Sequence, residues 1–415
     1  MTAEQISDID VDDSYRFVRD RGSSVVRLSY GGGMWLIAGY PELMEALRDD
    51  AVFSSKHDLP NGTGNGGVMV PSTPVRAVPI ELDPPEHIGF RRLLAKQFRP
   101  ERIRQLEMQI TRYTTWCIDR HIAEGRMDLF AHLAELIPAM VTMRFIGLPV
   151  EDAKIVADAV HTRGDARFAE TPAWQLLMVR ISEAIRARSA TPEDDLISFL
   201  LSADVGGEPL DEDTIREMCF TMVIGGMSTT AKLALGALTY FAVHPDQRAR
   251  ARTDEEFLNS AIEEFLRYYA PVPFLCRTAT EDVTVAGQDI KCGERVAMGF
   301  AAANRDERAF DEPDAVRLDR APNRHLALGH GVHVCVGAAL GRAEVRVMVR
   351  EVLTRMPDYR LSSGFHEREL AAMFDRNRTT WADRIERGLP VEFTPGPVSD
   401  SEFRLRFNEQ GRSDD

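Results

Sequence analysis

Cysteine is scarce in this sequence, and the cysteines present form no pattern of pairs. The five residues are an odd number, include no CxxC motif and are scattered from Cys117 to Cys335. A disulfide framework needs an even set at regular spacings, so a disulfide scaffold is excluded. Scattered free thiols favour the reducing cytoplasm.

An excess of positive charge is also missing. The formal net charge is −15, which excludes nucleic acid as a general partner because phosphate binding needs a basic surface. The N-terminal residues, MTAEQISDID, contain neither the basic region nor the apolar core of a signal peptide. We therefore expect a cytoplasmic protein.

Long apolar runs are missing too. The longest, 218–231, has about 14 residues and ends at Lys232, whereas a membrane span needs about 20. We expect no membrane partner. A hydrophobic content of 44% with 28% charged residues is instead typical of a globular protein with a large core.

Helical periodicity dominates what is present. It extends through 87–201 with breaks at Pro100, Gly125, 147–149 and 171–172, and continues in three later segments: 211–243, 254–269 and from about 338 onward. Short alternating stretches predict a β-hairpin at 25–28 and 34–37 and antiparallel strands within 278–298. The predicted fold class is mainly α with a small β region (α+β).

The sequence contains no linker that would separate independent domains. We expect one catalytic domain over 21–395, a partly ordered N-terminal segment at 1–20, and a polar C-terminal tail at 396–415 that is frayed or disordered. The Gly-, Pro- and Asn-rich stretch 60–75 is a long loop, and such loops are often functional.

Cys335 stands out by its surroundings. Gly329, Gly331 and Gly337 allow the backbone to come near whatever the sulfur holds, and a helical pattern begins three residues later. The positive end of that helix would stabilise a thiolate. A single thiolate wrapped by backbone suits the axial ligand of a haem iron. The alternative is an ordinary buried cysteine.

This stretch resembles the haem-binding loop of the cytochrome P-450 (heme-thiolate monooxygenase) superfamily, in its soluble bacterial type. The family pattern Phe-x-x-Gly-x-His/Arg-x-Cys-x-Gly reads here Leu328, Gly331, His333, Cys335 and Gly337, with Leu328 as the one departure. The resemblance covers about 20–395. It implies a triangular-prism helical domain that holds haem b between a long central helix and the thiolate loop.

The resemblance also implies roles for residues outside the loop. His87, Arg91, Arg277 and His333 match family positions that hold the haem propionates. Glu264 and Arg267 match the Glu-x-x-Arg motif, a buried ion pair joined by an arginine of the meander that follows. Ala315 stands where many relatives carry that arginine, so either Arg317 or Arg320 is expected to complete the network.

The predicted central helix contains two adjacent glycines, each of which costs about 1 kcal/mol relative to alanine. Close helix packing is one explanation. The family offers another, in which Gly225, Gly226 and Thr229 form a groove for dioxygen over the iron. Ser228 replaces the usual acid, and serine can pass a proton on but cannot supply one by changing charge. The substrate, another acid, or an unusual reaction could compensate.

The expected substrate pocket is mainly apolar, so a small hydrophobic molecule of secondary-metabolite, terpenoid, steroid or aromatic type is the expected ligand. The candidate pocket residues are Met69, Val70, Val223, Val272, Phe274 and Thr380.

No redox module is attached. The resemblance therefore implies electrons from NAD(P)H through a separate ferredoxin or flavodoxin and its reductase. A basic patch could dock that protein through electrostatic attraction, with solvated helix faces as the alternative. The patch residues are Arg91, Arg92, Lys96, Arg99, Arg342, Arg346 and Arg350.

The predicted reaction is insertion of one oxygen atom into the substrate. Two rivals stay open because of Ser228. One is a haem-thiolate enzyme that uses peroxide directly or performs coupling or nitration. The other is a haem-binding protein that senses or holds a ligand without turnover.

Overall fold

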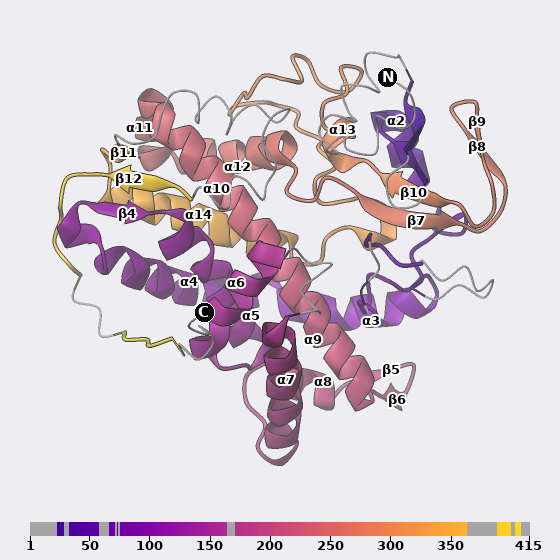
Figure 1. Ribbon diagram of the computed structural model, residues 1–415, viewed down its shortest axis with the longest axis horizontal. Coiled ribbons are helices and arrows are strands. Elements are labelled where there is room, and N and C mark those ends of the chain that lie inside the picture. The colour runs from indigo at the N-terminus through magenta and orange to yellow at the C-terminus, as the bar shows by residue number, and fades with distance from the viewer. Residues whose placement is uncertain are drawn as a thin grey trace. The chain divides into compact units, whose positions relative to one another are not determined.

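The computed structural model describes residues 23–28, 33–57, 66–70, 73, 75–163, 171–362, 388–399 and 403–407. The chain forms two compact units, each built from separate segments (Figure 1). The first unit comprises 1–92, 263–336 and 375–380, and the second comprises 93–262, 337–374 and 381–415. The predicted N-terminal segment 1–20 lies outside the described residues, as does part of the predicted tail 396–415.

A five-stranded mixed sheet organises the first unit. Its order is β1 (Val25–Leu28), β2 (Met34–Ile37), β10 (Arg295–Met298), β7 (Leu275–Ala279) and β3 (Phe53–Ser54). The predicted hairpin is confirmed by the antiparallel pairing of β1 with β2. The parallel pairing of β2 with β10 joins segments about 260 residues apart, which no local pattern indicates.

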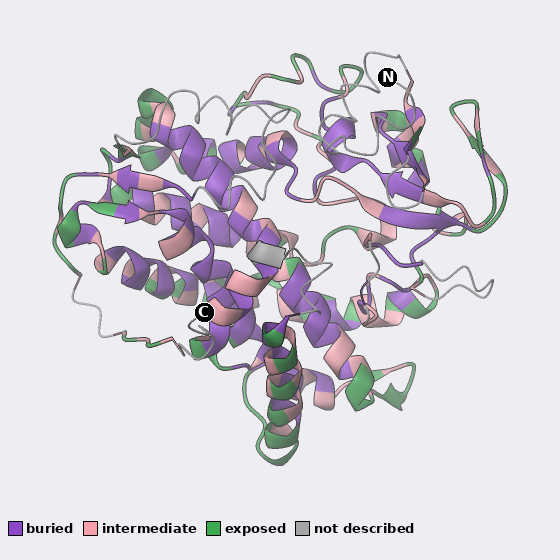
Figure 2. Cartoon of the chain, in the orientation of Figure 1, coloured by how far each residue is buried: buried purple, intermediate pink, exposed green. Residues whose placement is uncertain are grey.

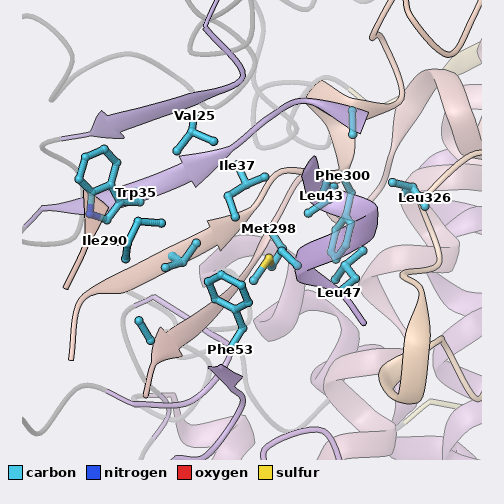
Figure 3. Packing of buried hydrophobic residues seen from close by; sticks show 14 residues of the cluster. Val25, Trp35, Ile37, Leu43, Leu47, Phe53, Ile290, Met298, Phe300 and Leu326 are labelled. Carbon is cyan, nitrogen blue, oxygen red and sulfur yellow. The ribbon is translucent and has the colours of Figure 1, made fainter. Parts of the chain in front are cut away.

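The core of this unit covers one face of the sheet. Trp35, Ile37 and Met298 alternate with residues of the opposite face, as the period of two along a strand requires (Figure 3). Leu43 of α2 (Tyr40–Ala46) and Phe300 of α13 (Phe300–Ala303) pack against them. These contacts anchor the sheet that carries Arg277 on β7.

The remaining elements of the first unit are short. The hairpin β8 (Val283–Val285) and β9 (Gln288–Ile290) lies between β7 and β10 in sequence, which confirms the predicted antiparallel strands. Residues 304–324 contain no helix or strand, as predicted for this charged stretch. The first turns of α3 (Glu86–Ala95) and the 3₁₀ turn Gly331–His333 complete the unit.

The second unit is helical. Its main helices are α4 (Pro100–Asp119), α5 (Leu136–Ile146), α6 (Ala153–Arg163), α7 (Pro172–Ala190), α8 (Leu196–Leu201), α9 (Glu212–Gly226), α10 (Ser228–Val243), α11 (Pro245–Thr253) and α14 (Ala338–Arg355). Helix α12 (Glu255–Tyr269) begins in this unit. Two small sheets accompany them: β4 (Arg126–Asp128) with β12 (Pro390–Glu392) and β11 (Arg360–Leu361), and β5 (Asp204–Val205) with β6 (Glu208–Pro209).

The helix ends agree with their sequence signals. Asp211 accepts a hydrogen bond from the Thr214 N–H (2.7 Å) and so caps α9, while α5 ends at Gly147 with φ +103°. The mainly α prediction with a small β region is confirmed.

The long predicted helix is present as two segments. Helices α9 and α10 together span 212–243, and a bend at Met227 separates them (Figure 1). Among the described residues, this is the one stretch long and apolar enough to span a membrane by length and composition. Most of it is buried inside the protein, as in a core helix (Figure 2).

Candidate active site

The loop around Cys335, in the first unit, is held by backbone geometry. The Cys335 N–H donates to the Leu328 carbonyl (2.8 Å), and Gly329 and Gly331 have φ values of +72° and +70°. A Cβ on Gly331 would stand 2.3 Å from the Leu47 carbonyl oxygen, so only glycine fits there. The loop exposes Cys335, and the chain enters α14 at Ala338, as predicted.

Two histidines lie side by side next to this loop. The rings of His87 and His333 have centroids 4.3 Å apart, and the His333 Nε2 is 3.1 Å from the Ser55 hydroxyl. The Nδ1 atoms of both are buried without a hydrogen-bond partner among the described residues. Ser55 follows β3, and nothing in the local sequence singles it out.

Arginines make this group cationic. Burial lowers the pKa of Arg277 to about 10, and its guanidinium donates to the Cys276 carbonyl (2.8 Å). Burial also lowers the pKa of Arg91, while the negative charge of a Cys335 thiolate opposes that shift. Burial, followed by the charge of Arg277, lowers the pKa of His333 to about 2, so this imidazole is neutral.

The arrangement can therefore receive an anionic group. Two guanidinium groups supply positive charge, and the two free Nδ1 atoms of His87 and His333 can donate once their tautomers are set. The two carboxylates of a haem meet these requirements beside an exposed thiol. The residues present fit that cofactor.

A buried ion network lies in the same unit. Glu264 and Arg267 are both 0% exposed and form a bidentate pair with two bonds of 2.8 Å. The Arg320 Nε donates to Glu264 (3.0 Å), whereas Arg317 contributes only its backbone N–H (2.8 Å). Arg320 is thus the meander arginine whose side chain completes the network.

The glycine pair in the second unit has two different surroundings. A Cβ on Gly226 would stand 2.7 Å from the Thr142 hydroxyl of α5, so this glycine permits close helix packing. A Cβ on Gly225 would meet no atom within 4 Å, and the Gly225 carbonyl accepts a hydrogen bond from Thr229 (2.9 Å). The glycines interrupt the helix next to Ser228, a kind of site where bends are common.

The expected pocket residues are distributed over both units. Val70 and Phe274 are partly buried against the sheet face that contains Cys276, and Val272 packs on the opposite core cluster. Val223 of α9 is fully buried. Met69 is partly buried, and Thr380 lies outside the described residues.

The charged residues expected to dock a redox protein also differ among themselves. Lys96 and Arg99 are exposed, while Arg342, Arg346 and Arg350 of α14 are partly buried. Arg346 forms an ion pair with Glu107 of α4, so its charge is already neutralised in part.

Known proteins resemble this chain closely. The family described as Cytochrome P450 matches residues 172–356, a range that includes Cys335 and the glycine pair. Cytochrome P450 109 of Bacillus spizizenii is 30% identical over 353 residues, which cover 80% of this chain and 82% of that protein. Vitamin D(3) 25-hydroxylase of Pseudonocardia autotrophica is 32% identical over 341 residues, covering 81% and 84%.

The fold has solved counterparts as well. The crystal structure of CYP109E1 from Bacillus megaterium in complex with testosterone matches with a TM-score of 0.74 and 29% identity, covering 86% of this chain and 94% of that one. The likeness therefore extends to three dimensions over most of both chains.

Proposed function

The chain belongs to the cytochrome P450 family and is a P450 monooxygenase, and we propose that Cys335 is the ligand of its haem iron. The observation that carries this assignment is the exposed thiol in a glycine loop beside two arginines and two histidines with free, buried Nδ1 atoms. When bound, the haem supplies the activation of dioxygen, which a thiolate ligand promotes.

Each neighbouring residue has a role in this proposal. Arg91, Arg277, His87 and His333 bind the propionates and hold the haem in one orientation. Gly331 keeps the backbone of the loop against Leu47, so that the sulfur stays at a fixed position. The Glu264 network fixes the meander that leads into this loop.

The reduced, carbon-monoxide-bound absorption spectrum tests the assignment. We expect a strongly red-shifted Soret band in the wild type and its loss in Cys335→His, which offers a neutral nitrogen ligand instead. Cys292→Ser, which changes another exposed cysteine, is the control and should keep the shift. An unshifted band in the wild type, or a shifted one in Cys335→His, would refute the proposal.

For the substrate we propose a small apolar organic molecule of secondary-metabolite, terpenoid, steroid or aromatic type. The apolar side chains of Met69, Val70, Val272 and Phe274 support this class, and so do the vitamin D3 and testosterone in the names of two relatives. Titration with testosterone, vitamin D3 and a charged aromatic acid should produce a spin-state shift with the apolar compounds only. A shift with the acid alone would exclude the proposed class.

For the electrons we propose a separate ferredoxin or flavodoxin with its reductase, drawing on NAD(P)H in the cytoplasm. The exposed Lys96 and Arg99 offer positive charge on a protein whose net charge is −15. Reconstitution with such a pair should give NAD(P)H-dependent product.

Ser228 favours a second candidate, a haem-thiolate enzyme that uses peroxide directly or catalyses coupling or nitration. Peroxide-driven turnover in the absence of any reductase, faster than turnover with reduced ferredoxin, would favour it. A spin-state shift with no product under either condition would favour a ligand-holding or sensing protein.

A further inference from the structure

Glu344, on α14, is a buried carboxyl group without a partner. Its side chain is 3% exposed, and its Oε2 has no hydrogen-bond partner in the parts of the chain that the structure describes. Other buried acids of the second unit are paired: Asp195 with Arg188 (2.5 Å) and Asp152 with Arg180 (2.7 Å). Burial raises the pKa of Glu344 well above its usual value, so this group keeps its proton at neutral pH.

The position of Glu344 follows from its helix. Helix α14 packs against α10, and a Cβ on Gly341 would stand 3.7 Å from the Thr230 hydroxyl. Glu344 is three residues later and therefore on the same face as Gly341. Long side chains in a helix lean toward its N-terminus, which directs the carboxyl group over the Gly341 turn. Because glycine leaves that turn open, the carboxyl group has room beside Thr230.

The hydroxyl groups at the start of α10 form a continuous series. Ser228 and Thr230 are buried, with 3% and 7% exposure, and Thr229 lies between them in sequence. A hydroxyl can donate one hydrogen bond while it accepts another, so it passes protons without a change of charge. These residues lack a group that releases a proton, because Ser228 occupies the place of the usual acid.

We propose that Glu344 supplies protons to the hydroxyl groups of 228–230, in place of the carboxylic acid missing at Ser228. The carboxyl O–H gives its proton to the Thr230 hydroxyl, directly or through one water, and that hydroxyl gives its own proton onward. The carboxylate formed recovers a proton from solvent water, so each cycle carries one proton inward and breaks no other bond. The inference rests on the proposed monooxygenase function and extends it.

Glu344 acts through other residues, so its test needs a readout that a structural role would not change. The infrared C=O band of a protonated carboxylic acid should be present in the wild type at neutral pH and absent in Glu344→Gln. It should shift in Thr230→Val, which removes the hydroxyl and keeps the shape. The matched control is Thr239→Val on the same helix, whose hydroxyl bonds the Leu235 carbonyl and which should leave the band unchanged.

Turnover supplies the second readout. With ferredoxin-delivered electrons, Glu344→Gln should form product about 100-fold more slowly, the lower end of what a positioned general acid contributes, while NAD(P)H oxidation continues. With hydrogen peroxide, which carries its own protons, the variant should match the wild type. Glutamine preserves the volume and stays neutral, so this variant is expected to fold.

The outcomes separate this inference from the assignment of Cys335. A missing carboxylic acid band in the wild type, a band unmoved by Thr230→Val, or unchanged product formation in Glu344→Gln would each overturn the role of Glu344. An unshifted Soret band of the carbon monoxide complex would instead overturn the haem-thiolate assignment, whatever the infrared result.

Discussion

The network around Glu264 makes a quantitative prediction for the substitution Glu264→Gln. The carboxylate accepts bonds from Arg267 and Arg320, whose side chains are 0% and 5% exposed. Glutamine keeps the shape and removes the charge, which leaves two guanidinium groups buried without a counter-ion. Removing one partner of a buried pair costs about 3–5 kcal/mol, a large part of the ~5–15 kcal/mol that stabilises a typical protein.

Urea-induced unfolding, followed by circular dichroism and by tryptophan fluorescence, measures this loss. The control is Glu312→Gln, because Glu312 is 74% exposed and lies 3.7 Å from Arg317. An exposed pair of this kind contributes about 0–1 kcal/mol. The double variant Glu264→Gln/Arg320→Gln removes one of the two uncompensated charges, so it should recover part of the loss.

Two results would refute this reasoning. If Glu264→Gln loses less than about 1 kcal/mol, the network is no more than a surface pair. If the double variant is less stable than the single one by the full cost of a second buried substitution, the charge imbalance is not the cause.

Three further predictions follow from other parts of the chain. Gly331→Ala should lower haem content and the fraction with a red-shifted carbon monoxide band, because its methyl group would meet the Leu47 carbonyl oxygen; normal spectra would contradict the close contact. The stability of the wild type should fall as pH rises above 4.5, by at most about 1.4 kcal/mol per unit, since folded Glu344 retains a proton that the unfolded chain releases. Glu344→Gln should flatten that part of the profile, and parallel profiles would exclude a raised pKa. Lys96→Glu should slow reduction by an acidic ferredoxin at low salt and match the wild type at high salt; equal stopped-flow rates at low salt would remove Lys96 from the docking patch.

The glycine pair illustrates the limit of local sequence patterns. Gly225 and Gly226 are adjacent and identical, and the sequence allowed close packing or a bend for either. Only the approach of α5, which brings Thr142 within 2.7 Å of a Cβ on Gly226, separates them. Such a distance depends on a helix about 80 residues away in the chain, so no window of sequence contains it.

Two other assignments also required tertiary contacts. Arg317 and Arg320 are both plausible partners for Glu264 by sequence, and the fold of the meander directs only the Arg320 side chain to it. Glu344 looks like an ordinary charged helix residue in sequence. Its isolation becomes visible only when the packing of α14 removes water and supplies no cation.

The sequence by itself determined the mainly α class, the positions of most helices and the loop that presents Cys335. These features depend on periodicity, on glycine conformation and on caps, all of which act between residues close in the chain. The tertiary structure decided the parallel pairing of β2 with β10, the arginine that neutralises Glu264 and the burial of Glu344. Each of these depends on which distant segments exclude water from one another, and that information is spread over the whole chain.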